Sequence, residues 1–220
     1  MAYNYRGLTR SQQGDIQGAV ADHNEAIRLE PNDAEAYSNR GFIRSQQGDI
    51  QGAVADYDEA MRLNPSYGKV YGNRGYFRSQ ERDIQGAVAD FNEFIRVAPN
   101  DARAYNYRGY LRSQQGDIQG AADYNEAIRL NPNDTIAYND RGFVRSQQGD
   151  IQGAIADYNE AIRLEPNYAD AYYNRDLIRN KQGDKQGAIN DFRKASELYL
   201  QKGDTDSYRN AQNEIIELQK

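Results

Sequence analysis

Residues 34–67 have the sequence AEAYSNRGFIRSQQGDIQGAVADYDEAMRLNPSY, and most of the chain repeats this segment with few changes. The prolines give the period, because successive prolines lie 34, 34, 33 and 34 residues apart. They are Pro31, Pro65, Pro99, Pro132 and Pro166. A fixed period of this length is typical of a solenoid, in which each repeat packs only on its neighbours. We therefore expect one elongated array of repeats.

Each repeat predicts two helices. In the quoted segment the first runs from about Ala34 to Gln47, with Asp33 before it as the N-cap. Gly48 ends this helix, because glycine adopts the left-handed conformation without steric strain, and Asp49 can cap the next helix. Apolar residues three and four apart then predict one buried stripe, made of Ile50, Ala53, Val54, Tyr57, Ala60 and Met61. Pro65 ends the second helix, since the residue before a proline avoids the helical region.

This order of helix, Gly-Asp turn, helix and Pro turn resembles the tetratricopeptide repeat. The resemblance rests on the family's Trp, Gly, Ala, aromatic, Ala and Pro positions, which here hold Tyr37, Gly41, Ala53, Tyr57, Ala60 and Pro65. Arg40 and Arg44 depart from the usual Leu and Tyr, as in a bacterial arginine-bearing branch of the family. The resemblance implies an all-α fold, a right-handed superhelical solenoid of antiparallel helix pairs, whose first helices line a concave groove.

The repeats divide the chain into six copies and a final helix. The expected boundaries are 1–33, 34–67, 68–101, 102–134, 135–168 and 169–204, followed by a capping helix over 205–220. In the sixth copy Asp176 replaces the packing glycine, and the second helix should continue to about Lys202. Thr205 can cap the last helix, whose apolar face holds Tyr208, Ala211, Ile215 and Leu218. Terminal helices of this kind keep repeat arrays soluble.

Two copies are irregular. In the third, Phe94 replaces a small alanine, and Gly68 and Gly72 either make room for its ring or reflect neutral drift. The fourth is one residue short, and one residue turns a helix by about 100°. We expect Tyr124 to stay buried, Gly120 to fill the small-residue site and the turn near residues 116–117 to absorb the deletion.

Composition excludes several functions. The chain has no Cys and a single His, so no metal site, cofactor site or nucleophilic triad is expected, and His23 is predicted to be a core ring. The net charge of -6 disfavours nucleic acid as a partner. No apolar run reaches the roughly 20 residues of a membrane span, and no signal peptide is recognisable. We expect a cytoplasmic protein that does not bind membranes.

Each first helix carries two arginines four residues apart, such as Arg40 and Arg44. Six such pairs resemble a ladder that reads RNA bases. However, these arginines share a helix face with Tyr37, which should pack against the second helix, and one aspartate per repeat, such as Asp56, can pair with them. We therefore expect a structural role.

The opposite face of the first helices is the candidate binding surface. It carries a run of large side chains at the Phe42 site and of amides or rings at the Asn39 site, which either bind an extended peptide or pack on neighbouring helices. The candidate groove residues are Asn39, Phe42, Lys69, Asn73, Tyr76, Arg103, Tyr107, Tyr110, Asp140, Phe143 and Asn174. Lys69 and Arg103 make its centre basic, which favours an acidic side chain or a C-terminal carboxylate as the anchor of the ligand.

The leading functional hypothesis is a non-enzymatic scaffold that binds a peptide or protein segment in the groove. The alternative is a self-associating array, packed end to end or with swapped repeats as a homo-oligomer. An RNA-binding helical repeat is a third, less favoured interpretation, because the groove has no excess of Lys or Arg.

Overall fold

The computed structural model describes residues 2–219, which form thirteen α-helices joined by short turns and contain no strand. The helices are α1 (Ala2–Gln12), α2 (Ile16–Leu29), α3 (Ala34–Gln46), α4 (Ile50–Leu63), α5 (Gly68–Gln80), α6 (Ile84–Val97), α7 (Ala102–Gln114), α8 (Gly120–Leu130), α9 (Thr135–Gln147), α10 (Ile151–Leu164), α11 (Ala169–Lys181), α12 (Lys185–Lys202) and α13 (Thr205–Leu218). The expected all-α class is confirmed.

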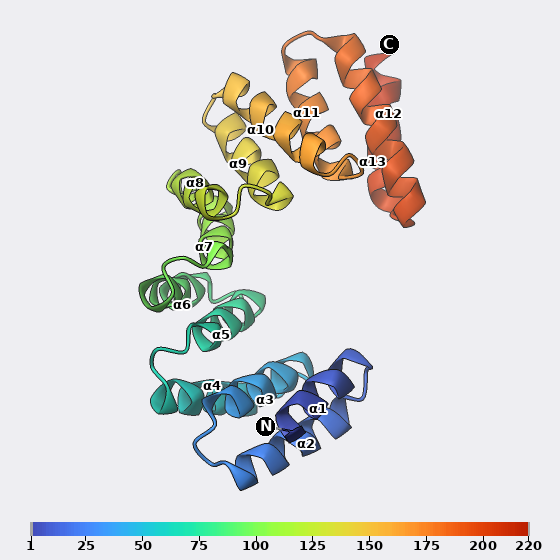
Figure 1. The fold of residues 1–220 in the computed structure, drawn as a ribbon. Helices are drawn as coiled ribbons and strands as arrows, with labels where there is room; N and C mark the ends of the chain where they lie inside the picture. The colour runs from blue at the N-terminus through green and yellow to red at the C-terminus, as the bar shows by residue number, and fades with distance from the viewer. Residues whose placement is uncertain (1, 220) are drawn as a thin grey trace. The chain divides into compact units, whose positions relative to one another are not determined.

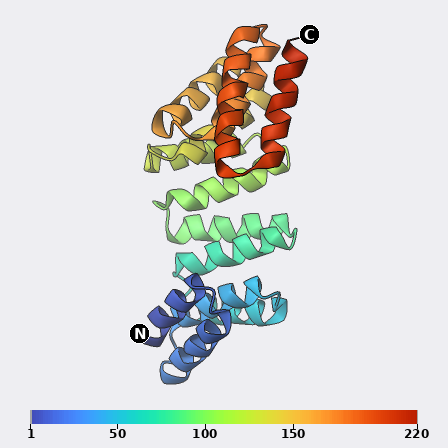
Figure 2. The ribbon, with the colours of Figure 1, turned by 90° about the vertical axis from the view of Figure 1, so that its right-hand side faces the viewer.

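The chain divides into two compact units, one ending at Leu111 and one beginning at Arg112, so that the boundary lies within α7. In the first unit the helices pack as hairpins, α1 with α2, α3 with α4 and α5 with α6 (Figure 1). In the second unit α9 pairs with α10 and α11 with α12, and α13 packs on α12 (Figure 2). First helices also contact the next first helix, as α3 contacts α5 and α9 contacts α11.

The Gly-Asp turns form as the sequence predicts. Gly48 has φ 78°, and the Asp49 side chain accepts a hydrogen bond from the backbone N–H of Gly52 at 2.9 Å. A Cβ on Gly52 would overlap Oδ2 of Asp49, so a larger residue there would force the capping carboxylate to shift. The same pairing recurs at Asp15 with Gly18, Asp83 with Gly86, Asp150 with Gly153 and Asp184 with Gly187.

The core of the second repeat is narrower than the predicted stripe. Ala53, Tyr57 and Ala60 are fully buried, but Ile50 is 44% exposed and Val54 is 40% exposed. The equivalent side chains of the third and fifth repeats are partly buried against the core, so the exposure of Ile50 and Val54 is particular to α4; those side chains are Ile84, Val88, Ile151 and Ile155. The prediction that both belong to the buried stripe is wrong.

The irregular third copy has a steric explanation. Phe94 is buried, and a Cβ added to Gly68 or Gly72 would approach its ring to 2.9 or 2.8 Å. Such distances are shorter than real Cβ contacts. The structure therefore supports compensation by the two glycines rather than neutral drift.

The fourth copy absorbs its deletion before α8. Tyr124 is only 1% exposed and Gly120 is buried, as expected. Asp117 caps the N–H of Gln119, two residues on, and α8 begins at Gly120, which makes it 11 residues long where α4 and α10 have 14. The first turn of the helix is therefore replaced by an irregular turn, which leaves Ile118 exposed.

The C-terminal helices agree with the sequence in outline. α12 ends at Lys202, and Gly203 follows it in the left-handed conformation with φ 75°. Asp204 caps α13 by accepting from the N–H of Ser207 at 3.0 Å, so the expectation that Thr205 is the cap is wrong by one residue. Ala211 and Ile215 of α13 are buried beside Phe192.

Candidate functional site

The arginine pairs are structural. Arg40 donates to both carboxylate oxygens of Asp56, at 2.9 and 2.5 Å, and Arg44 donates to the same carboxylate at 2.9 Å. Asp56 is almost fully buried, so the pairing satisfies a carboxylate that is removed from water. Both arginines of the pair bind one aspartate in this way at Asp22, Asp90, Asp157 and Asp191 as well. These guanidinium groups therefore form ion pairs within the repeats.

The first arginine of a pair also joins neighbouring repeats, which the sequence did not reveal. Arg40 donates to Asn24 on the second helix of the preceding repeat at 2.7 Å, and its guanidinium lies 5.4 Å from the centre of the Tyr37 ring. The equivalent links to the preceding second helix are Arg74 to Asp58, Arg108 to Asn92, Arg141 to Asn125 and Arg175 to Asn159.

Seven of the candidate groove residues line one pocket in the first unit, with a volume of about 510 Å³. They are Asn39, Phe42, Lys69, Asn73, Tyr76, Arg103 and Tyr107. The pocket is formed by the groove faces of α3, α5 and α7, and we call it the groove pocket.

Aromatic rings form the walls and floor of the groove pocket. Tyr107 stacks on Phe91 with ring centres 5.3 Å apart, and Tyr76 meets Tyr107 edge-on at 6.2 Å. Tyr76 is 43% exposed and Tyr107 is 45% exposed, whereas Phe91 and Phe94 are buried beneath them. Phe91 and Phe94 were not among the predicted groove residues, although both line the pocket. The sequence did contain a sign of this role, because Phe94 replaces the alanine of the other copies and Gly68 and Gly72 occur in the preceding helix.

The rim of the groove pocket is less basic than expected. Arg103 forms two hydrogen bonds with Asp101, at 2.9 and 2.5 Å. The pKa of Asp101 is lowered mainly by these bonds and, to a smaller extent, by the charge of Lys69. Lys69 itself is exposed and forms no ion pair with any residue of the described chain. Lys69 is therefore the cation at the rim that is available to a ligand.

The groove asparagines hold neighbouring first helices together. The Nδ2 of Asn39 donates to Asn4 at 3.0 Å, and that of Asn73 donates to Ser38 at 3.1 Å. In the second unit Asn174 donates to Asn139 at 3.0 Å. Each of these amides therefore uses one of its two N–H donors between helices, which supports packing on neighbouring helices as a role for the Asn39 site.

The remaining candidates do not line the groove pocket. Tyr110 lies in the first unit and is exposed. Phe143, in the second unit, is 46% exposed. Asp140, also in the second unit, accepts a hydrogen bond from Asn139 at 3.1 Å, and burial raises its pKa to about 6.

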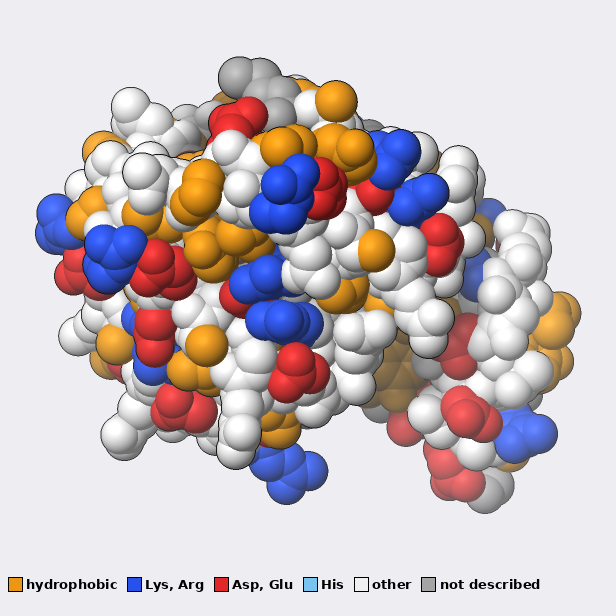
Figure 3. Space-filling model, turned by 90° about the horizontal axis from the view of Figure 1, so that it is seen from below, with side chains coloured by type: hydrophobic (Ala, Val, Ile, Leu, Met, Phe, Trp, Pro, Cys, Tyr) orange, Lys and Arg blue, Asp and Glu red, His pale blue; other side chains and the backbone are white. Residues whose placement is uncertain are grey.

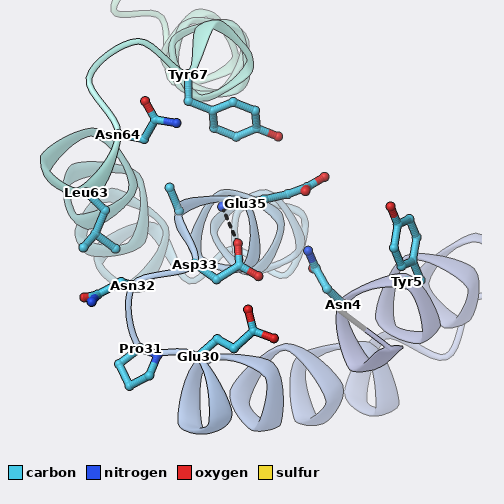
Figure 4. A pocket seen from close by; sticks show the side chains of 11 residues that line it. Asn4, Tyr5, Glu30, Pro31, Asn32, Asp33, Glu35, Leu63, Asn64 and Tyr67 are labelled. Atoms are coloured by element: carbon cyan, nitrogen blue, oxygen red, sulfur yellow. Dashed lines mark hydrogen bonds between the residues drawn. The ribbon is translucent and has the colours of Figure 1, made fainter.

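A second hollow of the first unit, of about 670 Å³, contains none of the candidate residues (Figure 4). Glu30, Asp33 and Glu35 give it a negative charge, and the ring of Tyr67 lies across it from Asp33 (Figure 4). Burial, followed by the charges of Glu35 and Asp33, raises the pKa of Tyr67 to about 12. The second hollow is therefore acidic, whereas the rim of the groove pocket carries the unpaired Lys69.

Charges of both signs are interspersed on the face seen in Figure 3, and neither sign dominates it. Over residues 2–219, no three His, Cys, Asp or Glu side chains are grouped so that they could hold a metal ion. Within that same range no helix has both the length and the apolar character of a membrane-spanning segment.

The fold defines a protein built from stacked helix hairpins, and comparison with known families identifies the class. Models described as "TPR repeat" match residues 7–48 and 145–183, and models described as "Tetratricopeptide repeat" match residues 34–67, 78–135 and 123–156. The chain belongs to the tetratricopeptide repeat family.

Several solved structures have a similar fold. Pseudomonas aeruginosa PilF has a TM-score of 0.82 at 18% identity, over 97% of this chain and 96% of that one. YrrB, described as a tetratricopeptide repeat protein with an unusual peptide-binding site, has a TM-score of 0.69 at 21% identity, over 87% and 97%. MamA has a TM-score of 0.68 at 23% identity, over 79% and 95%. No curated protein sequence gave a significant match.

Proposed function

We propose that this protein is an interaction scaffold that binds an extended peptide or protein segment in the groove pocket. The observation that carries the proposal is the pocket itself, because seven residues chosen from the groove face of the sequence line one hollow. Its exposed rings offer apolar contact area, and Lys69 offers a positive charge.

The exposed rings are the strongest argument for a ligand. A tyrosine buries a large apolar surface when a partner covers it, and Tyr and Arg are enriched in the centres of protein interfaces. Tyr76 and Tyr107 keep more than two fifths of their surfaces exposed and contact each other edge-on, with ring centres 6.2 Å apart. Rings that are rigid before binding lose little conformational entropy when a ligand arrives.

The anchor of the segment is an acidic side chain or a C-terminal carboxylate. Lys69 is the unpaired cation at the rim, and the acidic hollow formed by Glu30, Asp33 and Glu35 excludes the same group from the neighbouring surface. The peptide-binding site described for YrrB concerns a protein that shares only the fold with this chain.

A charge reversal tests this function. Peptides selected from a random display library against the intact protein are measured again with the variant Lys69→Glu, Arg103→Glu. We expect acidic peptides to lose at least about tenfold in affinity, the equivalent of about 1.4 kcal/mol. The matched control, Lys185→Glu with Arg193→Glu, makes the same change in net charge on exposed residues of α12 and should bind as the wild type does.

Unchanged affinity of acidic peptides for the groove variant would contradict the proposal. Light-scattering mass is measured against protein concentration in the same samples. A mass that rises with concentration in the absence of peptide would instead favour the self-associating array.

A further inference from the structure

We infer that the irregular third repeat turns the groove pocket into a socket for one large apolar side chain, which the ligand carries directly beside its acidic group. This inference rests on the proposed function and specifies the chemistry of the segment that the groove takes. Phe91 and Phe94 form the floor of the socket, Tyr76 and Tyr107 its walls, and Lys69 its charged rim.

The socket arises from three departures from the regular repeat. At the site of Phe94 the other copies have Ala26, Ala60, Ala127, Ala161 and Ala195. At the sites of Gly68 and Gly72 the second copy has Ala34 and Ser38. A side chain at either glycine would collide with the Phe94 ring. The third repeat has therefore exchanged two small side chains of α5 for one aromatic ring that reaches the groove from α6.

The walls of the socket favour an apolar side chain over a second acidic one. Phe91 and Phe94 are held rigidly by their burial, and Tyr107 stacks on Phe91 at an interplanar angle of 11°. Ring faces present negative partial charge, which disfavours a carboxylate lying over them. Lys69 lines the same pocket and forms no ion pair within residues 2–219, so the carboxylate belongs on the residue next to the inserted side chain.

The test compares the wild type with a reversion to the second repeat, Gly68→Ala, Gly72→Ser, Phe94→Ala. These residues occur together at the same sites in residues 34–67, so the variant should fold. A random decapeptide library is selected on the full-length wild type and on the reversion. We expect the wild type to enrich Leu, Ile, Met or Phe next to Asp or Glu, and the reversion to lose the apolar preference.

Fluorescence anisotropy on one enriched peptide then gives the size of the effect. Replacing its apolar residue by Ala should weaken binding to the wild type about tenfold, as burial of one such side chain implies, and should change binding to the reversion little. A second variant, Tyr107→Asn, places the residue of the second repeat at one wall and should reduce the same discrimination without altering the floor.

The outcomes separate the two proposals. Peptides that bind and depend on Lys69, but tolerate Ala at every apolar position, would overturn the apolar socket and leave the proposed function intact. Equal discrimination by the wild type and by both variants would overturn it as well. A library that yields no binder to the wild type would contradict the proposed function and, with it, this inference.

Discussion

At the scale of single residues, His23 is the most exceptional core group of the first unit. It occupies the site held by Phe91 and Phe192 in other copies, is fully buried, and neither ring nitrogen has a hydrogen-bond partner within residues 2–219. Burial lowers its pKa, because the protonated ring cannot be solvated. Asp22, Asp33 and Asp56 oppose this effect, and Arg40 adds to it.

We expect His23→Phe to stabilise the protein and to reduce its sensitivity to acid. The unfolded His23 takes up a proton near pH 6.5 and the folded one only at lower pH, so stability falls as the pH drops below about 6.5, by up to about 1.4 kcal/mol per pH unit. Urea unfolding followed by circular dichroism at pH 7.5 and 5.5 measures this. A variant whose stability falls between these pH values as steeply as that of the wild type would show that His23 is not responsible.

Asp176 is the corresponding exception in the second unit. It stands at the packing-glycine site of the sixth copy, is fully buried, and its two carboxylate oxygens have no hydrogen-bond partner in the described chain. Burial, followed by the charge of Asp191 on α12, raises its pKa to about 10. The backbone N–H of Leu177 and, more weakly, the charge of Arg175 oppose this rise, and the charge of Glu214 on α13 adds to it. The side chain is therefore protonated in the folded protein at neutral pH.

We expect Asp176→Asn to be stabilising at pH 7.5 and nearly neutral at pH 3.5. Folding must add a proton to this group above its unfolded pKa of about 3.9, so the wild type loses stability as the pH rises from about 4 towards 10. The difference at pH 7 should be about 2–4 kcal/mol. Melting temperatures of both proteins at the two pH values test this, and an equal difference at both would contradict it.

The sequence predicted the contacts that form within one repeat better than the contacts that form between repeats. The arginine pairs were assigned correctly, because a charge that recurs on a buried face needs a partner, and Asp56 recurs with the same period. The hydrogen bond from Asn39 to Asn4 was missed because it joins two helices that are not consecutive. A single-helix projection shows which face a residue lies on but not which neighbouring helix it reaches.

At the scale of helices, the Phe94 ring of α6 packs against Gly68 and Gly72 of α5, so substitutions at these sites should be coupled. Gly72→Ala should destabilise the protein by about 1–3 kcal/mol, because the added Cβ would lie 2.8 Å from the Phe94 ring. Phe94→Ala should be destabilising by about 3–5 kcal/mol because it leaves a cavity. Combining the two changes should cost less than the sum of the single effects, since the alanine no longer meets a ring. Urea midpoints of the four proteins give the coupling, and strict additivity would contradict the contact.

The shortened fourth copy supplies a prediction about helix α8. Inserting Val between Ala121 and Ala122 restores the regular GAVADY sequence and should let Asp117 cap Gly120 in place of Gln119. The helix should then begin about two residues earlier, at Ile118, as α4 begins at Ile50. Hydrogen exchange of the Ala121 amide should slow, because it gains a helical acceptor, and that of the Gln119 amide should become faster, because it loses Asp117. A matched insertion of Val after Ile155, in the regular fifth copy, should destabilise α10 because it turns Tyr158 away from the core. Unchanged exchange in the first variant would contradict this account.

At the scale of the whole molecule, the period of the sequence predicted the all-α class and the helix hairpins within each unit. The turn glycines, the aspartate caps and the ends of the helices follow from local rules that act within one repeat, as Gly48 and Asp49 illustrate. The groove pocket was predicted in part, since its rings and Lys69 share a helix face in the sequence. Its floor could not be predicted, because Phe94 reaches it from the following helix.

The location of the groove pocket leads to a prediction for a shorter chain. All eleven of its lining residues lie between Asn39 and Tyr107, within the first unit. A fragment of residues 1–134 retains these residues together with α8, and we expect it to bind library-selected peptides within about twofold of the full-length affinity. Anisotropy titrations of both proteins measure this. A loss of more than about tenfold would mean that residues after 134 contribute to binding.

The arginines that reach back to the preceding repeat join one copy to the next at equivalent positions. Arg40 donates to Asn24, and Arg175 donates to Asn159. These are equivalent positions of the repeat, so the same hydrogen bond joins consecutive copies in both units. A duplicate of residues 34–67 inserted after Tyr67 would meet its required neighbours on both sides. The chain should therefore accept additional whole repeats of 34 residues.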